Sequence, residues 1–164
     1  MRAIDSQFLR NGLGCFATGI ATVTTRRANG SPVAVTINSF SSLSMDPPLV
    51  QWNLDSRSTA LEAFKGAPGF LVHILAAHQD ELSKRFSRQG EDRWNGVEYD
   101  EGVFGLPRLR GAHATIECAL HDVLSGGDHQ MFLGRVLRVD TDVDARPLVF
   151  YRGRYHQLAA DSGP

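Results

Sequence analysis

The spacing of hydrophobic and polar residues predicts a protein built mostly of β-strands. Runs rich in β-branched and aromatic residues, bounded by Gly, Pro, Asn or Ser, recur along the whole chain. The first two runs flank Asn29-Gly30, which is a strong signal for a β-hairpin. The predicted strands cover residues 20–25, 32–37, 41–44, 49–54, 70–75, 112–124, 129–139, 148–151 and 155–158.

Three other segments follow helical spacing. A short helix over 59–65 has Ser58 as a candidate cap, and residues 78–88 are amphipathic. The third helix is predicted over 4–16, where Asp5 or Ser6 can cap an apolar series made of Ile4, Phe8, Leu9, Leu13 and Phe16.

The polar stretch 89–111, in contrast, contains Gly and Pro and predicts a long loop with little regular structure.

The strand patterns predict an antiparallel β-barrel. Ala114, Ile116, Cys118 and Leu120 alternate with Thr115, Glu117, Ala119 and His121, which indicates that only the first set faces the core. Residues 129–139 are apolar on both faces. A sheet buried on both faces in so small a protein suggests a closed barrel whose outer wall is covered by a second subunit. A doubly wound parallel sheet is disfavoured, because regular β-α-β alternation is missing.

Length and charge narrow the class of protein. The chain has 164 residues, and its 17 basic and 18 acidic side chains leave a formal net charge of -1. Because basic and acidic side chains are nearly equal in number, the protein lacks the strong positive field that binding to nucleic acid or an anionic membrane requires. No apolar run reaches the roughly 18 residues of a membrane-spanning helix. Asp5 and Gln7 occupy the place of a signal peptide's apolar core. We therefore expect a single domain over residues 1–164 in the cytoplasm.

Several common chemistries lack their motifs. Residues 12–17 match G-x-G-x-x-A, but a dinucleotide fingerprint follows a strand, and here a predicted helix precedes it. The histidines lack the spacing of metal ligands and no G-x-S-x-G elbow is present, so we predict neither a metal nor a hydrolase triad. His73 is predicted to be a hydrogen-bonded core histidine. Cys15 and Cys118 are predicted to be buried free thiols.

Two polar clusters are candidate binding sites. Residues 36–44 read TINSFSSLS, in which six of nine side chains carry a hydroxyl or an amide. An unsatisfied buried polar group costs about 1–3 kcal/mol. The stretch is therefore either a polar edge strand or a wall of donors for a flat, polar-rimmed ligand. Residues 53–59 run into a predicted helix, so Ser58 is either a plain N-cap or part of a phosphate site.

Two later segments have the same ambiguity. His129 follows the turn Gly126-Gly127-Asp128, where a histidine either faces solvent or contacts a ligand. Residues 151–155 read YRGRY, two aromatics and two cations that form either a solvated hairpin or a ligand contact.

In this order and spacing, the segments resemble those of the flavin reductase-like family, the small reductase components of two-component flavin monooxygenases. The resemblance runs from about Phe8 to Leu158. It is carried by FATGIATVTT at 16–25, TINSFSSLSMDPPLV at 36–50, the stretch 70–86 with Gln79 and Phe86, Gly111-Ala112, Glu117-Cys118, Gly127-Asp128-His129, and Pro147-Leu148 with 151–155.

The resemblance implies a split β-barrel of the FMN-binding type, antiparallel with Greek-key connections, that binds FMN or FAD at the interface of a homodimer. It also implies flavin reduction by NADH or NADPH, with the reduced flavin passed to a separate monooxygenase. By motif, the implied flavin-binding residues are Thr36, Ile37, Asn38, Ser39, Ser42, Leu43, Ser44, Asn53, Ser56, Ser58, Thr59, Phe86 and Ser87. The residues implied for the nicotinamide nucleotide are His129, Tyr151, Arg152, Gly153, Arg154 and Tyr155, with His129 as the orienting hydrogen-bond donor of the catalytic step.

Some questions stay open at this level. Ala34 and His73 stand where relatives often have Gly and Asn, respectively, which leaves the choice between FMN and FAD open. The choice between NADH and NADPH is open as well. A second interpretation keeps FMN tightly bound, in an electron carrier or a reductase of another acceptor such as a corrinoid or a ferric complex. A third is a non-catalytic binding module. Hydride transfer between stacked rings needs little acid–base help, which agrees with the missing catalytic triad.

Overall fold

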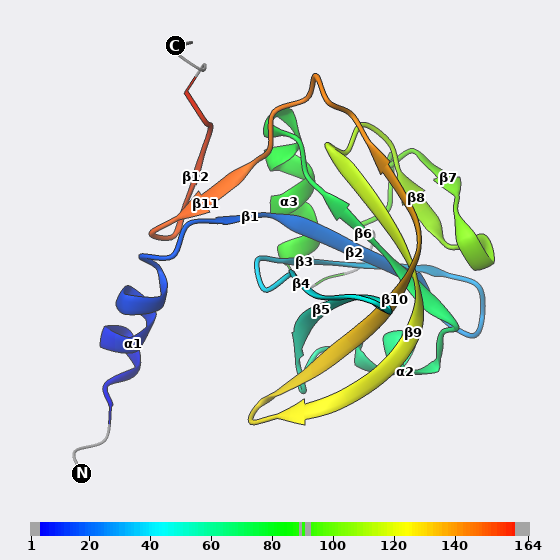
Figure 1. Ribbon diagram of the computed structural model, residues 1–164, viewed down its shortest axis with the longest axis horizontal. Coiled ribbons are helices and arrows are strands. Elements are labelled where there is room, and N and C mark those ends of the chain that lie inside the picture. Colours follow the sequence, from blue (N-terminus) through cyan, green and yellow to red (C-terminus); the bar gives the residue numbers. More distant parts are fainter. Residues whose placement is uncertain (1–3, 89, 91–92, 160–164) are drawn as a thin grey trace.

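The computed structural model describes residues 4–88, 90 and 93–159, and β-strands dominate it (Figure 1). The strands are β1 (Thr18–Gly19), β2 (Ala21–Arg26), β3 (Pro32–Ile37), β4 (Ser41–Met45), β5 (Pro48–Asp55), β6 (Gly69–Ile74), β7 (Tyr99–Glu101), β8 (Pro107–Leu109), β9 (Ala114–Gly126), β10 (His129–Thr141), β11 (Val149–Tyr151) and β12 (Arg154–His156). The helices are α1 (Ser6–Leu13), α2 (Leu61–Gly66) and α3 (Asp80–Ser87), with 3-10 turns η1 (Ala77–Gln79) and η2 (Val103–Gly105). The predicted mainly β fold with a few helices is confirmed.

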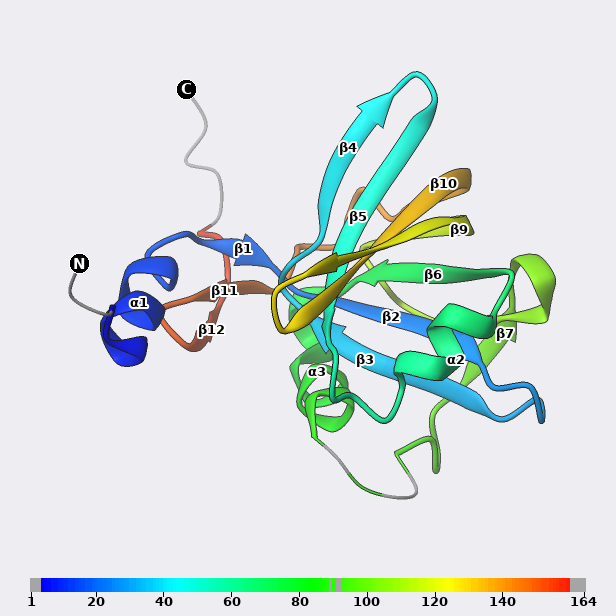
Figure 2. The same cartoon turned by 90° about the horizontal axis from the view of Figure 1, so that it is seen from below.

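Seven strands form one antiparallel sheet in the order β3-β2-β6-β9-β10-β5-β4. The hairpin predicted at Asn29-Gly30 is confirmed by the pairing of β2 with β3. Two register shifts between β9 and β10 accompany the strong curl of these long strands, and the β4–β5 hairpin projects from the rest of the sheet (Figure 2). Within the described residues, the edge strands β3 and β4 are not paired with each other, so this sheet is not a closed barrel.

An aromatic cluster fills the inside of the curl. The Trp52 ring stacks on Phe132 with centroids 4.6 Å apart, and Phe64 and Phe70 pack edge-on against Trp52. A Cβ at Gly134 would overlap the Phe70 ring, so the packing requires glycine at this position of β10. This core fixes β5, β6 and β10 against one another and so sets the position of the loop that follows β5.

Residues 89–111 hold more regular structure than the sequence predicted, although residues 89, 91 and 92 lie outside the described part. Strand β8 of the β7–β8 hairpin packs against β2 and β6, and Arg26 Nε on β2 donates to the Gly105 carbonyl of η2 over 2.6 Å. The Thr24 hydroxyl donates to the Pro107 carbonyl over 2.5 Å, and the Val103 N–H donates to Glu117 Oε2 over 2.7 Å. The partners are 83 and 14 positions away in the sequence, so the local pattern does not reveal these short strands.

This packing also corrects the prediction that 114–120 has one buried face. Thr115 and Glu117, on the face expected to be open, are both buried. Glu117 is only 1% exposed, and its Oε1 lies 3.4 Å from Arg108 Nε on β8. The second face is covered by the segment that was predicted to be a loop.

His73 is a hydrogen-bonded core histidine, as predicted. Its Nδ1 lies 3.1 Å from the Thr22 carbonyl, and its Nε2 accepts from the Leu109 N–H over 3.0 Å. Burial lowers the pKa of His73 from 6.5 to about 4, with a smaller contribution from the charge of Arg108. The ring is therefore neutral, donates from Nδ1, and ties β2 to β8.

Helix α1 differs most from expectation. Its start is as predicted, because the Asp5 carboxylate accepts from the Phe8 N–H over 2.9 Å. However, the helix ends at Leu13 rather than at the predicted residue 16, and none of its residues is buried, because α1 stands apart from the sheet (Figure 1). Phe8 in the helix and Phe16 after it are 77% and 78% exposed. Cys15 is consequently exposed, so its predicted burial is wrong, whereas Cys118 is buried and both thiols are free.

Candidate functional site

Two adjoining pockets open at the side of the sheet, where β3, β5 and α3 meet. The first, called the histidine pocket, has a volume of about 550 Å³ and is lined by Thr36, Ile37, Asn38, Ser39, Asn53, Leu54, Asp55, Gly126, His129 and Met131. The second, called the arginine pocket, has a volume of about 520 Å³ and is lined by Val35, Thr36, Leu54, Asp55, Arg57, Ser58, Thr59, Ala60, Phe86, Ser87, Arg88 and Arg93. Thr36, Leu54 and Asp55 belong to both, so the pockets are continuous.

The histidine pocket is built on strand register. β10 pairs with β5 so that His129 lies opposite Asp55 and Met131 opposite Asn53. The end of β3 supplies the opposite wall. The Ser39 hydroxyl accepts from the Asn53 N–H over 3.0 Å, which joins this wall to β5. The lining combines apolar side chains with uncharged hydrogen-bonding ones, and Asp55 is its one carboxylate.

His129 enters this pocket with a fixed ring orientation. Its Nδ1 lies 2.7 Å from Asp128 Oδ1, and this hydrogen bond lowers the pKa of the Asp128 carboxyl. The side chain of His129 is 45% exposed. With Nδ1 engaged, Nε2 is the nitrogen left for a ligand.

One wall of the arginine pocket is the loop after β5. Arg57 donates to Asp55 from its backbone N–H, Nε and Nη2, over 2.8, 3.1 and 2.8 Å, and these bonds lower the pKa of the Asp55 carboxyl. Ser58 was predicted to cap the next helix, but α2 begins at Leu61 with Ala60 in the cap position. The Ser58 hydroxyl instead accepts from the Ala60 N–H over 3.3 Å within a turn.

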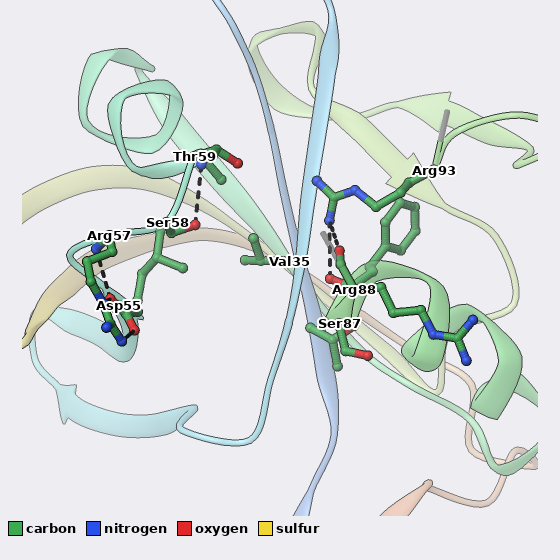
Figure 3. Close-up of a pocket in the computed structure, with 12 residues that line it drawn as sticks. Val35, Asp55, Arg57, Ser58, Thr59, Ser87, Arg88 and Arg93 are labelled. Atoms are coloured by element: carbon green, nitrogen blue, oxygen red, sulfur yellow. Dashed lines mark hydrogen bonds and ion pairs between the residues drawn. The ribbon is translucent and has the colours of Figure 1, made fainter. Parts of the chain in front are cut away.

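The opposite wall is the end of α3 and the segment after it. Figure 3 shows the Asp55–Thr59 loop on one side of Val35 and Ser87, Arg88 and Arg93 on the other. The Ser87 hydroxyl donates to the Lys84 carbonyl over 2.9 Å. Three guanidinium groups and one carboxylate line the pocket, and Arg57 already neutralises that carboxylate. The arginine pocket is thus electropositive and suits an anionic ligand.

The structure brings together most of the residues singled out in the sequence. The two pockets contain Thr36, Ile37, Asn38, Ser39, Asn53, Ser58, Thr59, Phe86, Ser87 and His129. The lining also contains residues that were not among the predicted ligand contacts: Val35, Leu54, Asp55, Arg57, Ala60, Arg88, Arg93, Gly126 and Met131. Asp55 and Gly126 lie inside segments that the sequence already marked as candidate binding sites, whereas nothing in the local sequence distinguishes Arg88 or Arg93 from other surface arginines.

Other candidate residues do not line either pocket of their own chain. Ser42, Leu43 and Ser44 lie on the projecting strand β4, and Ser56 lies beside Gln130, whose Nε2 donates to its hydroxyl over 3.4 Å. These residues lie at the edge of the described sheet or just outside the pockets.

The segment from Tyr151 to Tyr155, which includes Arg152, Gly153 and Arg154, lies beside α1. The Arg152 N–H donates to the Gly14 carbonyl over 3.0 Å, and the Tyr155 hydroxyl lies 2.9 Å from Ser83 Oγ. The segment is separate from both pockets in a single chain.

Neither a metal centre nor a membrane helix is found in the described part of the chain. No group of three or more His, Cys, Asp or Glu residues within it is arranged to hold a metal ion. None of its helices is long and apolar enough to cross a membrane.

Comparison with known proteins gives a consistent result. The model of the flavin reductase like domain matches residues 13–159. The chain is 37% identical over 159 residues to the reductase subunit HsaB of a flavin-dependent monooxygenase from Rhodococcus jostii, covering 97% of this chain and 81% of that protein. It is 38% identical over 155 residues to the FMN reductase (NADH) SmoA of Agrobacterium fabrum, covering 94% and 87%.

Among solved structures, the NADH:FAD oxidoreductase SgcE6 of Streptomyces globisporus, in complex with NAD and FAD fragments, superposes with a TM-score of 0.91 at 31% identity. The match covers 99% of this chain and 100% of that one. Sequence and fold agree over nearly the whole chain, which therefore belongs to the flavin reductase-like domain family.

Proposed function

We propose that the protein is a flavin reductase, which transfers a hydride from NADH or NADPH to FMN or FAD and supplies reduced flavin to a separate monooxygenase. The continuity of a neutral, hydrogen-bonding pocket with an electropositive one is the observation that carries this proposal. A flavin nucleotide has the same two parts, a flat ring with a polar rim and an anionic tail. The names of the relatives HsaB and SmoA support the same reaction.

The histidine pocket fits the flavin ring because β3 is an edge strand. The Ala34 carbonyl accepts from Arg93 and so faces away from β2. Alternation along a strand then directs the backbone groups of Thr36 to the same side, toward the pockets. Backbone N–H groups here would bind the ring's polar rim together with Asn38 and Ser39. They would also stabilise the negative charge that grows on a flavin as it is reduced.

The arginine pocket fits the phosphate. Ser58 and Thr59 offer hydroxyl groups at its wall, and the guanidinium groups supply positive charge. The following helix, α2, has only six residues, so we assign the anion to these side chains rather than to the helix end. Asp55 acts here as a positioning residue because it holds the Arg57 side chain at the end of β5.

His129 is proposed to position the nicotinamide nucleotide. Asp128 holds its Nδ1 and leaves Nε2 for the nucleotide; Nε2 accepts when the ring is neutral and donates when the ring carries its second proton. A bound flavin supplies the redox chemistry by accepting the hydride. The protein supplies binding, ring orientation and charge stabilisation.

We also propose that residues 1–164 act as one domain and form a homodimer in which the sheet becomes part of a split β-barrel. Apolar side chains stand exposed on the projecting hairpin, where Met45 is 88% exposed, and on α1. A second copy would cover them and bring Ser42–Ser44 and the segment 151–155 to a partner's pockets. Light scattering should give twice the mass of one chain. We place the reaction in the cytoplasm, where NADH and NADPH are regenerated.

Steady-state kinetics tests the reductase assignment. Purified protein is mixed with NADH or NADPH, first without flavin and then with rising FMN or FAD. We expect oxidation of the nicotinamide nucleotide to rise and saturate with added flavin. If neither NADH nor NADPH is oxidised with either flavin, the proposal is wrong. Oxidation that ignores added flavin would instead indicate a resident flavin that serves another acceptor.

A further inference from the structure

Arg93 differs from the other two arginines of the arginine pocket in the direction of its guanidinium group. The Arg57 guanidinium is folded back onto Asp55, and the Arg88 side chain points away from Val35 (Figure 3). The Arg93 guanidinium instead extends toward β3 and lies across the pocket from the loop that carries Ser58 and Thr59. It is the arginine aimed into the pocket.

Arg93 is held rigidly in this position. Its Nη1 donates to three carbonyls, those of Ala34 on β3 over 3.3 Å, Phe86 on α3 over 3.4 Å and Arg88 over 3.0 Å. Within the described residues, Nε and Nη2 have no hydrogen-bond partner. A planar guanidinium anchored through one nitrogen presents its remaining donors in a fixed fork, which matches a phosphate.

Arg27 lies next to the opposite wall of the arginine pocket, just outside its lining. Its Nη2 donates to the Thr59 carbonyl over 3.4 Å. Burial, and then the nearby charge of Arg27, lower the pKa of Arg93. In the described part of the chain, neither Arg27 nor Arg93 forms an ion pair with a carboxylate, whereas Arg57 is paired with Asp55. Cationic side chains on both walls of one pocket, without a carboxylate partner among the described residues, indicate an anion site.

We propose that Arg93 and Arg27 bind the second, adenosine-side phosphate of FAD, which makes FAD the preferred flavin over FMN. This inference rests on the proposed reductase function. The phosphate nearer the flavin ring lies with Ser58 and Thr59, and FMN has no further phosphate to reach the opposite wall. The volume of about 520 Å³ leaves room for a nucleotide half beside the ring pocket. Guanidinium groups at its mouth also stack well on a nucleobase.

Binding of the two flavins to the intact protein gives the first test. Quenching of flavin fluorescence measures the Kd of FAD, FMN and riboflavin. We expect FAD to bind about tenfold more tightly than FMN, as one additional charge-assisted contact provides. Equal or tighter binding of FMN would overturn the inference.

Substitution of Arg93 gives the second test. Arg93→Met should raise the Kd and the KM of FAD about tenfold, change those of FMN less than about threefold, and leave kcat for FAD near its original value. Arg27→Met should act in the same direction more weakly because Arg27 is exposed. Arg93→Lys should recover part of the FAD affinity. Arg85→Met on α3 removes an exposed arginine outside both pockets and is the matched control.

Two results would contradict this assignment. A parallel loss of FAD and FMN affinity in Arg93→Met would mean that Arg93 serves a phosphate common to both, or the fold alone, and a drop in the melting temperature would identify the latter. No change in either flavin would exclude Arg93 from the site. Failure of the wild-type protein to use any flavin would overturn the proposed function together with this inference, whereas turnover without FAD preference overturns the inference alone.

Discussion

His73, inside the curled sheet, and Arg93, at the rim where the two pockets open, differ in how their nitrogen atoms are hydrogen-bonded. His73, fully buried inside, has both ring nitrogens hydrogen-bonded. At the rim, Arg93 is bonded through one nitrogen and directs the others at the pocket, while the Thr59 side chain lies exposed. Satisfied polar groups stabilise a fold, and unsatisfied ones at a concave surface bind ligands. We therefore expect substitutions inside to change stability and those at the rim to change ligand affinity.

The largest effect should come from the aromatic cluster. Trp52→Ala removes the ring that stacks on Phe132 and contacts Phe64 and Phe70, and should lower the free energy of unfolding by about 3–5 kcal/mol. Urea unfolding measures the loss. Val143→Ala, at a side chain 85% exposed, is the control and should change stability by less than about 0.5 kcal/mol. Equal losses in the two variants would refute the division between inside and rim.

His73 should make stability depend on pH. Burial lowers its pKa from 6.5 to about 4, so the unfolded chain binds a proton more readily than the folded one between these values. The resulting stabilisation is complete above about pH 6.5, decreases as the pH falls, and amounts to about 3 kcal/mol. Urea unfolding at about pH 7.5 and about pH 5 should show a larger loss for wild type than for His73→Asn. The same loss in both would contradict the neutral, buried state of His73.

At the rim, the hydroxyl groups of Ser58 and Thr59 should affect phosphate binding alone. The double variant Ser58→Ala, Thr59→Val should weaken FMN binding about tenfold, because two hydrogen bonds to a charged group are lost. Riboflavin lacks the phosphate, so its Kd should not change. Fluorescence quenching compares the two ligands, and the free energy of unfolding should stay within about 1 kcal/mol. Parallel weakening of FMN and riboflavin would place the phosphate elsewhere.

His129 should give the smallest effect, confined to the nicotinamide nucleotide. His129→Ala should raise the KM for NADH about fivefold, the value of one hydrogen bond, and leave the flavin Kd unchanged. His121→Ala, at an exposed histidine on β9, is the matched control. Unchanged kinetics in His129→Ala would remove its positioning role.

Much of the fold could be predicted because its signals are local. Asn29-Gly30 marks a hairpin, and β9 and β10 extend over 13 residues each with strand composition. The hairpin β7–β8 escaped prediction because three-residue strands have no detectable period and depend on Thr24 and Glu117 for their place. The exposure of α1 escaped for the opposite reason, since amphipathic spacing shows that a helix has an apolar face but not whether its own chain covers it.

The site follows the same division. The polar run that begins at Thr36 and the loop that ends at Thr59 could be predicted as binding segments from their composition, and strand register brings them together. Arg93 shows no such sign. It becomes a pocket residue through the Ala34 carbonyl, 59 positions away in the sequence, and only the folded chain brings the two together. Segment 151–155 has a distinctive sequence but lies outside the histidine and arginine pockets of its own chain, and only the proposed homodimer would bring it to a partner's pockets.

The proposed function is tested most directly by anaerobic mixing of a small amount of the protein with a large molar excess of FAD over protein and at least one NADH per FAD, while the absorbance of oxidised flavin is recorded. The account predicts that the whole flavin pool is bleached, many equivalents per chain, because reduced flavin leaves and oxidised flavin replaces it. Bleaching that stops at one equivalent per chain, or none with either NADH or NADPH, would contradict a reductase that supplies free reduced flavin.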